Sequence, residues 1–301
     1  MSIVVVGSVA LDSVETPFGK VDQAVGGSAV YFSLAASHYA DVKLVGVVGA
    51  DFPPECAEML RRRGVDLEGL RFEEGETFRW AGRYDYNLSD CQTLDTRLNV
   101  FATFRPQLPE SYRDAGVVFL ANIDPALQLD VLQQIRRPWL TAMDTMNYWI
   151  SGKRDLVTQV MRSVDVVIVN EGELRQYAGT YSLLAAAREV LALGPKALVV
   201  KKGEYGAVMF ADGVYFVAPA YPLEVVRDPT GAGDSFAGGF LGHLASEGRV
   251  TMDALKRALI HGSVVASYVV EDFGVGRLLT LRPDDISQRY QEFRQFTHFE
   301  D

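Results

Sequence analysis

Residues 227–242 read Arg-Asp-Pro-Thr-Gly-Ala-Gly-Asp-Ser-Phe-Ala-Gly-Gly-Phe-Leu-Gly. Apolar residues recur at helical spacing from position 236 to 244, which predicts a helix that begins near Gly233. Gly231 and Gly233 flank Ala232, and such a run allows consecutive backbone N–H groups to turn toward one point. A helix N-terminus adds its own unpaired N–H groups and a partial positive charge. Together these features predict a site for an anion the size of a phosphate.

Asp234 falls in the first turn of the predicted helix, at the mouth of this anion site. A carboxylate there would repel a phosphate, so it is poorly placed merely to bind one. It is well placed to accept a proton from a hydroxyl group that attacks the phosphate. The alternative interpretation is that Asp234 only caps the helix after a glycine loop.

The run at 228–234, followed by the Gly-Gly pair at 238–239, resembles the C-terminal signature of the ribokinase-like, phosphofructokinase-B type (pfkB) carbohydrate kinases. The resemblance covers essentially the whole chain. It implies transfer of the γ-phosphoryl group of ATP to a hydroxyl group, most often a primary hydroxymethyl group, of a small sugar or polyol, with Mg²⁺ on the phosphates. Because the family also takes nucleosides, a nucleoside kinase is the alternative.

The same resemblance gives roles to four residues of the signature. Asp234 would orient and deprotonate the attacking hydroxyl. The N–H groups of Gly231, Ala232 and Gly233 would stabilise negative charge on the transferred group. Phosphoryl transfer leaves the protein mainly positioning and electrostatics to supply.

Near the N-terminus, the run at 7–12 leaves a first strand, and a Gly-Gly pair enters the next helix. Asp12, Gly26 and Gly27 match the family positions where an Asp binds substrate hydroxyls and the glycines let the substrate approach the backbone. The alternative for Asp12 is a turn residue. Tyr31 stands where several sugar kinases have Asn, so the sequence does not imply a simple ribose substrate.

Asn170 and Glu173 follow a predicted buried strand and match the family motif Asn-x-x-Glu. Mg²⁺ takes few protein oxygens and keeps several waters, so this pair is expected to hold it partly through water. The alternative is a capping box, with Asn170 at the N-cap and Glu173 closing it.

The segment at 199–208 reads as strand, turn and strand, and resembles the family's nucleotide-binding turn. Gly203 and Gly206 match its glycines, which let the backbone lie against the nucleotide. Lys201 and Lys202 are expected to neutralise phosphate charge; the alternative is a hairpin with solvated lysines.

A later loop that contains Gly274 resembles the one that closes over adenine. In many members this loop and the first Asp of the signature, here Asp228, hold a monovalent cation such as K⁺. Some members that take acidic sugars have an Arg after a central strand, where this chain has Tyr148 and Trp149. Without that anion clamp, a neutral polyol or nucleoside is expected.

Short apolar runs alternate with amphipathic helical stretches nearly throughout, which predicts an α/β fold with a mainly parallel central sheet and helices on both faces. Strands are expected at 3–6, 44–48, 117–120, 140–144, 166–169 and 197–201, and helices at 28–40, 53–63, 126–136, 153–163, 171–194, 235–247, 252–270 and 283–296. Two polar, aromatic-rich segments, about 11–25 and 70–104, with a turn near 87–90 in the second, predict a small antiparallel β lid within one domain of residues 1–301. Its apolar side is a candidate homodimer surface.

The net charge of −10 and the sequence pI of about 5.0 argue against a nucleic-acid partner, since no basic patch exceeds Arg61 to Arg63. No apolar run is long enough for a membrane span. The chain lacks a signal-peptide pattern, and two cysteines form neither a disulfide framework nor a metal motif, which fits a reducing cytoplasm.

Three rival functions are weaker. A serine hydrolase could use Ser235 as nucleophile, because Gly-Asp-Ser also opens a lipase and esterase motif, but the required acid is missing three residues before His298, where Gln295 stands. A dinucleotide-dependent oxidoreductase lacks the Gly-x-Gly-x-x-Gly run. A catalytically silent sensor on a kinase fold is disfavoured because Asp234 and its flanking glycines are intact.

Overall fold

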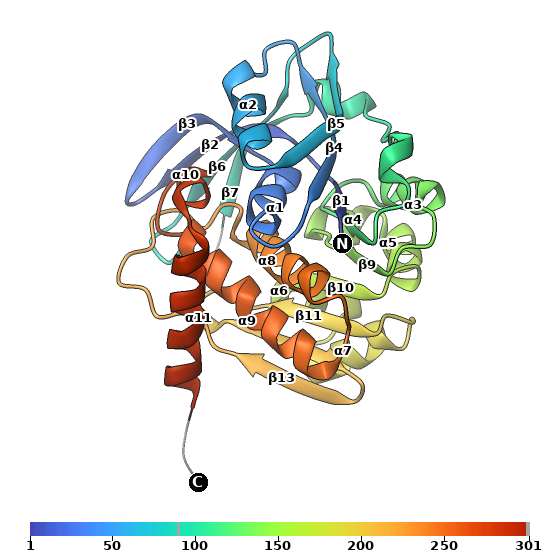
Figure 1. The fold of residues 1–301 in the computed structure, drawn as a ribbon, viewed down its shortest axis with the longest axis vertical. Helices are drawn as coiled ribbons and strands as arrows, with labels where there is room; N and C mark the ends of the chain where they lie inside the picture. Colours follow the sequence, from blue (N-terminus) through green and yellow to red (C-terminus); the bar gives the residue numbers. More distant parts are fainter. Residues whose placement is uncertain (89–90, 299–301) are drawn as a thin grey trace.

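The computed structural model describes residues 1–88 and 91–298, and its centre is a nine-stranded sheet in the order β13-β12-β11-β10-β9-β8-β1-β4-β5 (Figure 1). Seven neighbouring strands run parallel: β1 (Ile3–Val6), β4 (Val42–Gly49), β5 (Val65–Glu73), β8 (Val117–Leu120), β9 (Leu140–Met143), β10 (Val166–Asn170) and β11 (Ala197–Lys201). At one edge, β12 (Ala207–Ala211) pairs antiparallel with both β11 and β13 (Val214–Ala218). The predicted parallel sheet is confirmed.

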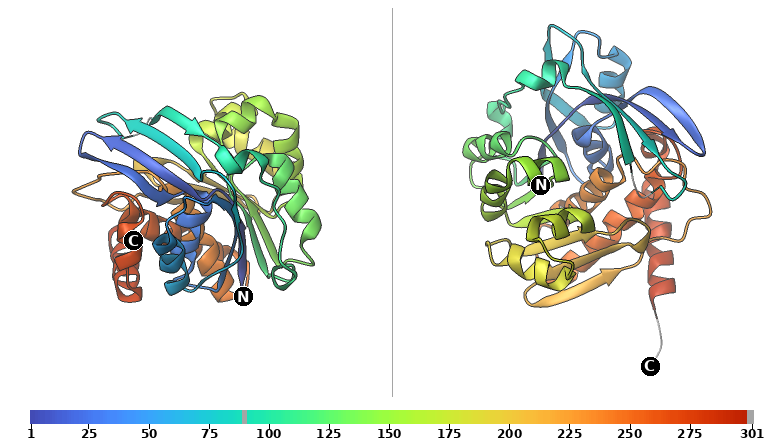
Figure 2. Two further views of the ribbon diagram at one scale, coloured as in Figure 1. Left: turned by 90° about the horizontal axis from the view of Figure 1, so that it is seen from above. Right: turned by 180° about the vertical axis from the view of Figure 1, so that it is seen from behind.

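Helices cover both faces of this sheet (Figure 2). One layer contains α1 (Ser28–Ala36), α2 (Pro54–Arg62), α8 (Ala232–Glu247), α9 (Met252–Val269), α10 (Gly276–Thr280) and α11 (Pro283–Thr297). The other contains α3 (Pro125–Gln134), α4 (Asn147–Gly152), α5 (Arg154–Arg162), α6 (Glu171–Ala178) and α7 (Leu183–Leu191), with the 3-10 helix η2 (Glu110–Tyr112).

Successive residues of the central strand feed two separate hydrophobic cores. In β1, Ile3 and Val5 pack in one core and Val4 and Val6 in the other, all fully buried. Side chains alternate between the faces of a strand, so a strand with a helical layer on each side must be apolar at every position. This requirement explains why the strands of this chain read as unbroken apolar runs.

The direction of the chain reverses at β1, which has β4 on one side and β8 on the other. In such sheets, the loops beyond the carboxyl ends of the strands at the reversal form the ligand-binding crevice. Residues that follow β1, β9, β10 and β11 therefore meet at one edge of the sheet.

A second, four-stranded sheet projects from the main body in the order β3-β2-β6-β7 (Figure 2). Its strands are β2 (Ala10–Thr16), β3 (Gly19–Gly26), β6 (Phe78–Tyr84) and β7 (Cys91–Arg97). The two outer pairings are antiparallel as predicted, whereas β2 and β6 at the centre pair in parallel. We call these four strands the lid.

The lid is shorter than the predicted segment 70–104 at both ends. Residues 70–73 continue β5, which pairs in parallel with β4 in the main sheet, and Leu70 is buried in a core. Near the other end, η1 (Asn99–Thr103) is a 3-10 helix whose Val100 packs against the sheet. The aromatic pattern could not separate main-sheet from lid strands. The turn predicted near 87–90 falls partly outside the described residues.

The helical stretch predicted at 171–194 consists of two helices. Gly179 adopts a left-handed conformation with φ 62°, which ends α6. Ser182 then caps α7, because its side chain accepts a hydrogen bond from the N–H of Ala185.

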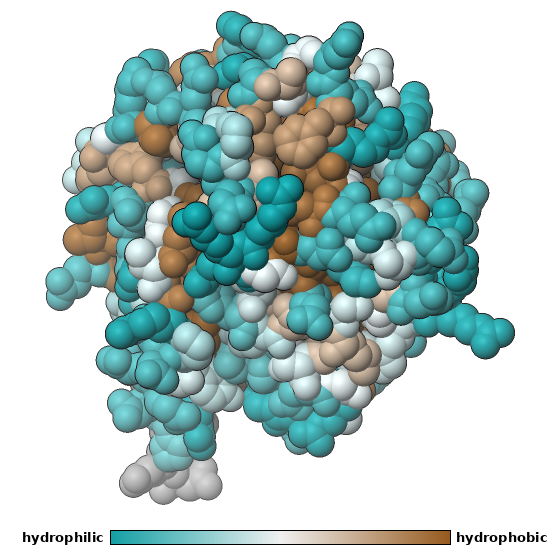
Figure 3. Space-filling model, turned by 45° about the horizontal axis from the view of Figure 1, so that its top comes forward, coloured by the Kyte–Doolittle hydropathy of each residue, from teal (hydrophilic) through white to brown (hydrophobic). Residues whose placement is uncertain are grey.

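No helix among the described residues is long and apolar enough to cross a membrane. The face drawn in Figure 3 is mainly hydrophilic, with apolar atoms exposed in a band near its centre. Cys56 and Cys91 are free thiols.

Candidate active site

Helix α8 begins directly after Gly231, which is left-handed with φ 75°. Within the described part of the chain, the N–H groups of Gly231 and Gly233 have no acceptor. The N–H of Ala232, in contrast, donates to the carbonyl of Pro229 at 3.2 Å. The expected three-amide anion site is thus wrong in one member: the Ala232 amide closes the turn, and two amides remain for an anion.

Both glycines of this turn face side chains from distant parts of the chain, and Gly231 is required by its neighbour. A Cβ atom at Gly231 would lie 2.3 Å from the ring of Tyr31, and one at Gly233 would lie 3.0 Å from Nζ of Lys201. The ammonium group of Lys201 therefore lies close to the turn for which the sequence predicts an anion site.

Asp234 lies in the first turn of α8, half-buried and not turned into the apolar interior. Burial raises its pKa to about 7, the negative charge of Asp144 adds to the rise, and Lys201 opposes it. A carboxyl group that titrates near neutral pH can both accept and release a proton at low cost, which suits a general base.

Asp144 is a site residue to which the sequence analysis gave no role, although it directly follows the central strand β9. Its carboxylate pairs with Nζ of Lys201 at 2.7 Å, and only 5% of the Asp144 side chain and 17% of the Lys201 side chain are exposed. A buried pair of this kind fixes both groups, since separating them would leave an uncompensated charge.

Asn170 and Glu173 form the capping box of α6. The Asn170 N–H donates to Glu173 Oε2 at 2.7 Å, and the Glu173 N–H donates to Asn170 Oδ1 at 2.8 Å. Glu173 is buried, and burial together with Asp144 raises its pKa to about 7. The alternative interpretation of these two residues is thus confirmed as geometry.

The capping box limits how Mg²⁺ can bind. No three His, Cys, Asp or Glu side chains within residues 1–88 and 91–298 are grouped to enclose a metal. Glu173 has one carboxylate oxygen outside the capping box, and its charge acts on Lys201. These residues fit an Mg²⁺ ion that reaches Glu173 and Asn170 through its own water ligands.

The turn after β11 contains the other predicted nucleotide residues. Nζ of Lys202 lies 3.6 Å from Oε1 of Glu171, the first residue of α6. Gly203 and Gly206 have positive φ angles of 55° and 85°. A Cβ at Gly206 would lie 2.1 Å from the Ala218 carbonyl, so β13 requires this glycine, whereas the space beside Gly203 is open.

Asp12 lies in β2, at the base of the lid, and is buried, so its alternative as a turn residue is excluded. Burial raises its pKa to about 7, partly offset by a hydrogen bond from the Gly27 backbone, and Asp234 and Asp228 add to the rise. A Cβ at Gly26 would lie 2.0 Å from Asp12 Oδ2, and one at Gly27 2.5 Å from the Ser8 carbonyl. The glycine pair therefore makes room for Asp12 and for the loop after β1, while the expected approach of a substrate to this backbone stays a prediction.

Asp228 is buried, and it joins the glycine turn before α8 to the predicted adenine loop. Its carboxylate accepts hydrogen bonds from the N–H of Thr230 at 2.9 Å and from the N–H of Gly274 at 3.4 Å. Gly274 has a φ of 60°, which lets the chain turn back toward this carboxylate.

The hydrolase alternative does not fit the structure. Ser235 is fully buried, and its Oγ has no hydrogen-bond partner within the described residues. His243 lies about two turns further along the same helix and stacks on His261, with ring centroids 4.0 Å apart. A nucleophilic serine needs a histidine within hydrogen-bond reach.

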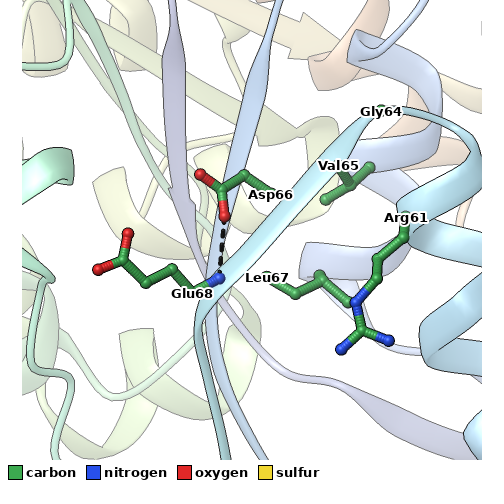
Figure 4. Close-up of a pocket in the computed structure, with 6 residues that line it drawn as sticks. All are labelled: Arg61, Gly64, Val65, Asp66, Leu67 and Glu68. Carbon is green, nitrogen blue, oxygen red and sulfur yellow. Dashed lines mark hydrogen bonds between the residues drawn. The ribbon is translucent and has the colours of Figure 1, made fainter.

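A surface hollow lined by Arg61, Leu67, Glu68 and the segment at 64–66 lies elsewhere (Figure 4). Val65 pairs with Val42, so the hollow is at the amino ends of β4 and β5. The carboxyl ends of the parallel strands hold the groups described above, and the hollow has no part in their chemistry.

Residues 2–280 match the family model of the pfkB family carbohydrate kinases. The chain is 31% identical over 265 residues to the cytidine kinase of Thermococcus kodakarensis, across 86% of this chain and 94% of that protein.

Solved structures share the fold at lower identity. The nucleoside kinase of Burkholderia thailandensis, solved with inosine, has a TM-score of 0.79 at 17% identity and covers 96% of this chain and 97% of its own. The aminoimidazole riboside kinase of Salmonella enterica, solved with aminoimidazole riboside and an ATP analogue, has a TM-score of 0.76 at 18% identity, with 96% and 100% covered. The family match and the 31% identical relative together show that the chain belongs to the pfkB family of carbohydrate kinases.

Proposed function

We propose that this protein transfers the γ-phosphoryl group of ATP to a hydroxyl of a neutral sugar, polyol or nucleoside, with Asp234 as the general base. The observation that carries the proposal is the start of α8, where the half-buried Asp234 lies beside two unpaired backbone N–H groups and the ammonium group of Lys201. This arrangement combines a proton acceptor with fixed positive charge at one point.

In the reaction, Asp12 accepts hydrogen bonds from the acceptor molecule and orients it. Asp234 takes the proton of the attacking hydroxyl as the new oxygen–phosphorus bond forms and the bond from the γ-phosphorus to its bridging oxygen breaks, releasing ADP. The N–H groups of Gly231 and Gly233 donate to the oxygens of the transferred group, and Lys201 balances their charge. Mg²⁺, bound with ATP near Glu173 and Asn170, would supply charge neutralisation on the phosphates.

We assign the nucleotide to the surface next to this turn. Gly203 leaves open space beside the backbone, Lys202 and Gly206 lie in the same turn, and Gly274 is held to Asp228. For a monovalent cation near Asp228, the support is its buried carboxylate at the junction of two loops. Activity measured in KCl and in tetramethylammonium chloride tests it, since only K⁺ can enter such a site.

The acceptor class follows from two observations. Tyr148 and Trp149 follow β9 and carry no positive charge, which favours an uncharged acceptor. The relative named above is a cytidine kinase, which supports a nucleoside as strongly as a sugar. ADP release measured with cytidine, inosine, D-ribose and myo-inositol decides between them. No ADP release with any neutral acceptor would contradict the proposal.

Replacement of Asp234 by Asn tests the base. The amide cannot accept the hydroxyl proton, so we expect kcat to fall by about 10²–10⁴-fold, while the protein folds and binds ATP as before. Ser235→Ala is the matched control, because Ser235 Oγ is buried and unpaired, and it should retain full activity. Turnover by Asp234→Asn at the wild-type rate would refute the assignment.

We also propose a homodimer through the lid. Phe18, Tyr86 and Leu94 on its strands and turns are about half exposed or more, and the whole of β7 is exposed. Exposed apolar side chains on one small sheet make it a candidate association surface. Light scattering of the wild type and of Leu94→Asp should give dimer and monomer masses; a monomeric wild type would contradict the proposal.

A further inference from the structure

Tyr31 lies between the two glycine turns of the active site. It belongs to α1 and is only 2% exposed. One edge of its ring, Cδ1 and Cε1, approaches Gly231 so closely that a Cβ there would lie 2.3 and 2.4 Å away. The opposite edge faces Gly26, where a Cβ would lie 3.4 Å from Cε2 of Tyr31 and 2.0 Å from Oδ2 of Asp12. The phenol ring therefore spans the distance between the substrate carboxylate and the phosphate-binding turn.

The Tyr31 hydroxyl has no hydrogen-bond partner in the part of the chain that the structure describes. Three neighbouring carboxylates, those of Asp12, Asp228 and Asp234, act on it electrostatically. Burial first, and then these charges, raise the pKa of Tyr31 well above its ordinary value, so the hydroxyl keeps its proton. The Tyr31 oxygen is not among the fully enclosed, unpaired polar atoms of the described residues, so water reaches it, and a substrate oxygen can take the place of that water.

The charges around the site decide which partner this hydroxyl needs. Ionised Asp12 and Asp234 only accept hydrogen bonds, so both bind donor hydroxyls of the acceptor molecule. Tyr31 supplies a donor between them. A substrate with two adjacent hydroxyl groups on its ring satisfies both Asp12 and Tyr31. One of these hydroxyls donates a hydrogen bond to Asp12, and its neighbour accepts one from Tyr31.

We propose that Tyr31 is a specificity-determining residue. Its hydroxyl donates a hydrogen bond to the substrate hydroxyl next to the one that Asp12 binds, so that the enzyme selects substrates with a vicinal diol. The inference rests on the proposed function, because it requires the acceptor to lie between Asp12 and Asp234. The ring of Tyr31 also sets the depth of this pocket, since its two edges pack against both glycine turns.

The test compares wild type and Tyr31→Phe with matched acceptors. The probes are cytidine with its 2′-deoxy and 3′-deoxy analogues, or D-ribose with its 2-deoxy and 3-deoxy analogues, whichever parent compound the wild type phosphorylates. Phenylalanine keeps the ring and its packing and removes only the donor. We expect KM for the parent compound to rise about 2- to 10-fold, the effect of one neutral hydrogen bond, with kcat nearly unchanged because the contact is made equally before and during reaction. With the analogue that lacks the contacted oxygen, wild type and variant should have equal KM values.

Tyr39→Phe is the control. Its hydroxyl bonds to Nδ1 of His261 at 3.0 Å, beyond the end of α1, so its loss should leave KM unchanged. Melting temperatures of both variants establish that they fold.

Each result has a separate meaning. An unchanged KM in Tyr31→Phe overturns the role of Tyr31 alone, as does a rise in KM of equal size with the parent and both deoxy analogues, which would show a packing effect. A wild type inactive toward every acceptor would overturn the proposed function and this inference together.

Discussion

Single residues in this site differ from their ordinary chemistry mainly because they are buried. Asp12, Glu173 and Asp234 all have pKa values raised to about 7, and in each case burial is the largest cause. The folded protein therefore holds protons on these groups between about pH 4 and 7 that the unfolded chain has released. Their ionisation therefore opposes folding, and the stability of the protein falls progressively on this account as the pH rises from about 4 to 7, with no further loss above that range.

Two buried histidines change the stability of the protein with pH in the opposite direction to these carboxyl groups. Burial lowers the pKa of His38 to about 4 and that of His261 to about 3, so between about pH 4 and 6.5 the unfolded chain binds more protons at these positions. The free energy of unfolding as a function of pH therefore contains the carboxyl and the histidine contributions together. Comparing a single variant with the wild type separates them.

Asp12→Asn isolates the carboxyl contribution, because the amide stays neutral at every pH. We expect the variant to be more stable than the wild type by about 1–2 kcal/mol at pH 8, because the folded wild type buries a charged carboxylate there and water relaxes only part of that cost. The difference should shrink as the pH falls from 8 to 5, where Asp12 is protonated in the folded wild type. Urea unfolding at pH 5, 6, 7 and 8 measures it; a difference that grows toward pH 5 would contradict the raised pKa.

At the level of secondary structure elements, the site depends on where strands end and one helix begins. Asp144 directly follows β9, Lys201 ends β11, and the two side chains meet across the end of β10. The start of α8 then lies against Lys201 through Gly233. The register of the parallel strands fixes where these strands end. The positions of Asp144 and Lys201 in the site therefore depend on the strand ends more than on the sequence of the loops.

Gly231→Ala tests the start of α8. Its φ of 75° costs an alanine about 1–2 kcal/mol, and the added Cβ would meet the ring of Tyr31 at 2.3 Å, which adds about 1–3 kcal/mol of overpacking. We expect a loss of more than about 2 kcal/mol in unfolding free energy and a fall of at least about tenfold in kcat/KM, because the unpaired amide moves.

Gly152→Ala is the matched control. This glycine ends α4, has no atom within 4 Å of the added Cβ, and should tolerate alanine with unchanged or higher stability. Chemical denaturation of both variants measures the contrast. Equal stability of Gly231→Ala and Gly152→Ala would show that Tyr31 can move aside.

The protein as one body consists of a rigid sheet with its helical layers and a lid that reaches over the carboxyl edge. The lid contacts the signature directly: Thr230 Oγ1 donates to the hydroxyl of Tyr84 at 3.3 Å, and Thr16 Oγ1 donates to the carbonyl of Arg227 at 2.9 Å. These bonds connect the lid to the turn that is proposed to bind phosphate, which is the arrangement needed to exclude water during transfer.

The double variant Thr16→Val, Tyr84→Phe removes both lid bonds and keeps the side-chain volumes. We expect ATP hydrolysis to rise severalfold relative to transfer, because water reaches the phosphate more often when the lid is held less firmly. Total ADP release compared with phosphorylated product gives the ratio. A ratio equal to that of the wild type would argue that the lid does not control water.

Much of the fold could be predicted because it depends on local patterns. The apolar runs fixed the parallel strands, and the glycine turn with Asp234 marked the start of α8. The boundary between main sheet and lid could not be predicted, since Leu70 in β5 and Phe78 in β6 belong to equally strand-like runs. Their assignment depends on which strand each one pairs with.

For the site, the sequence by itself determined which residues are proposed to carry the chemistry: Asp12, the glycine turn and Asp234 are recognisable from their order and spacing. Only the tertiary structure decided what surrounds them. The ion pair of Asp144 with Lys201 and the ring of Tyr31 against Gly231 join residues 57 and 200 positions apart. Such contacts follow from strand order and helix packing, which act between distant segments and leave no periodic trace in the sequence.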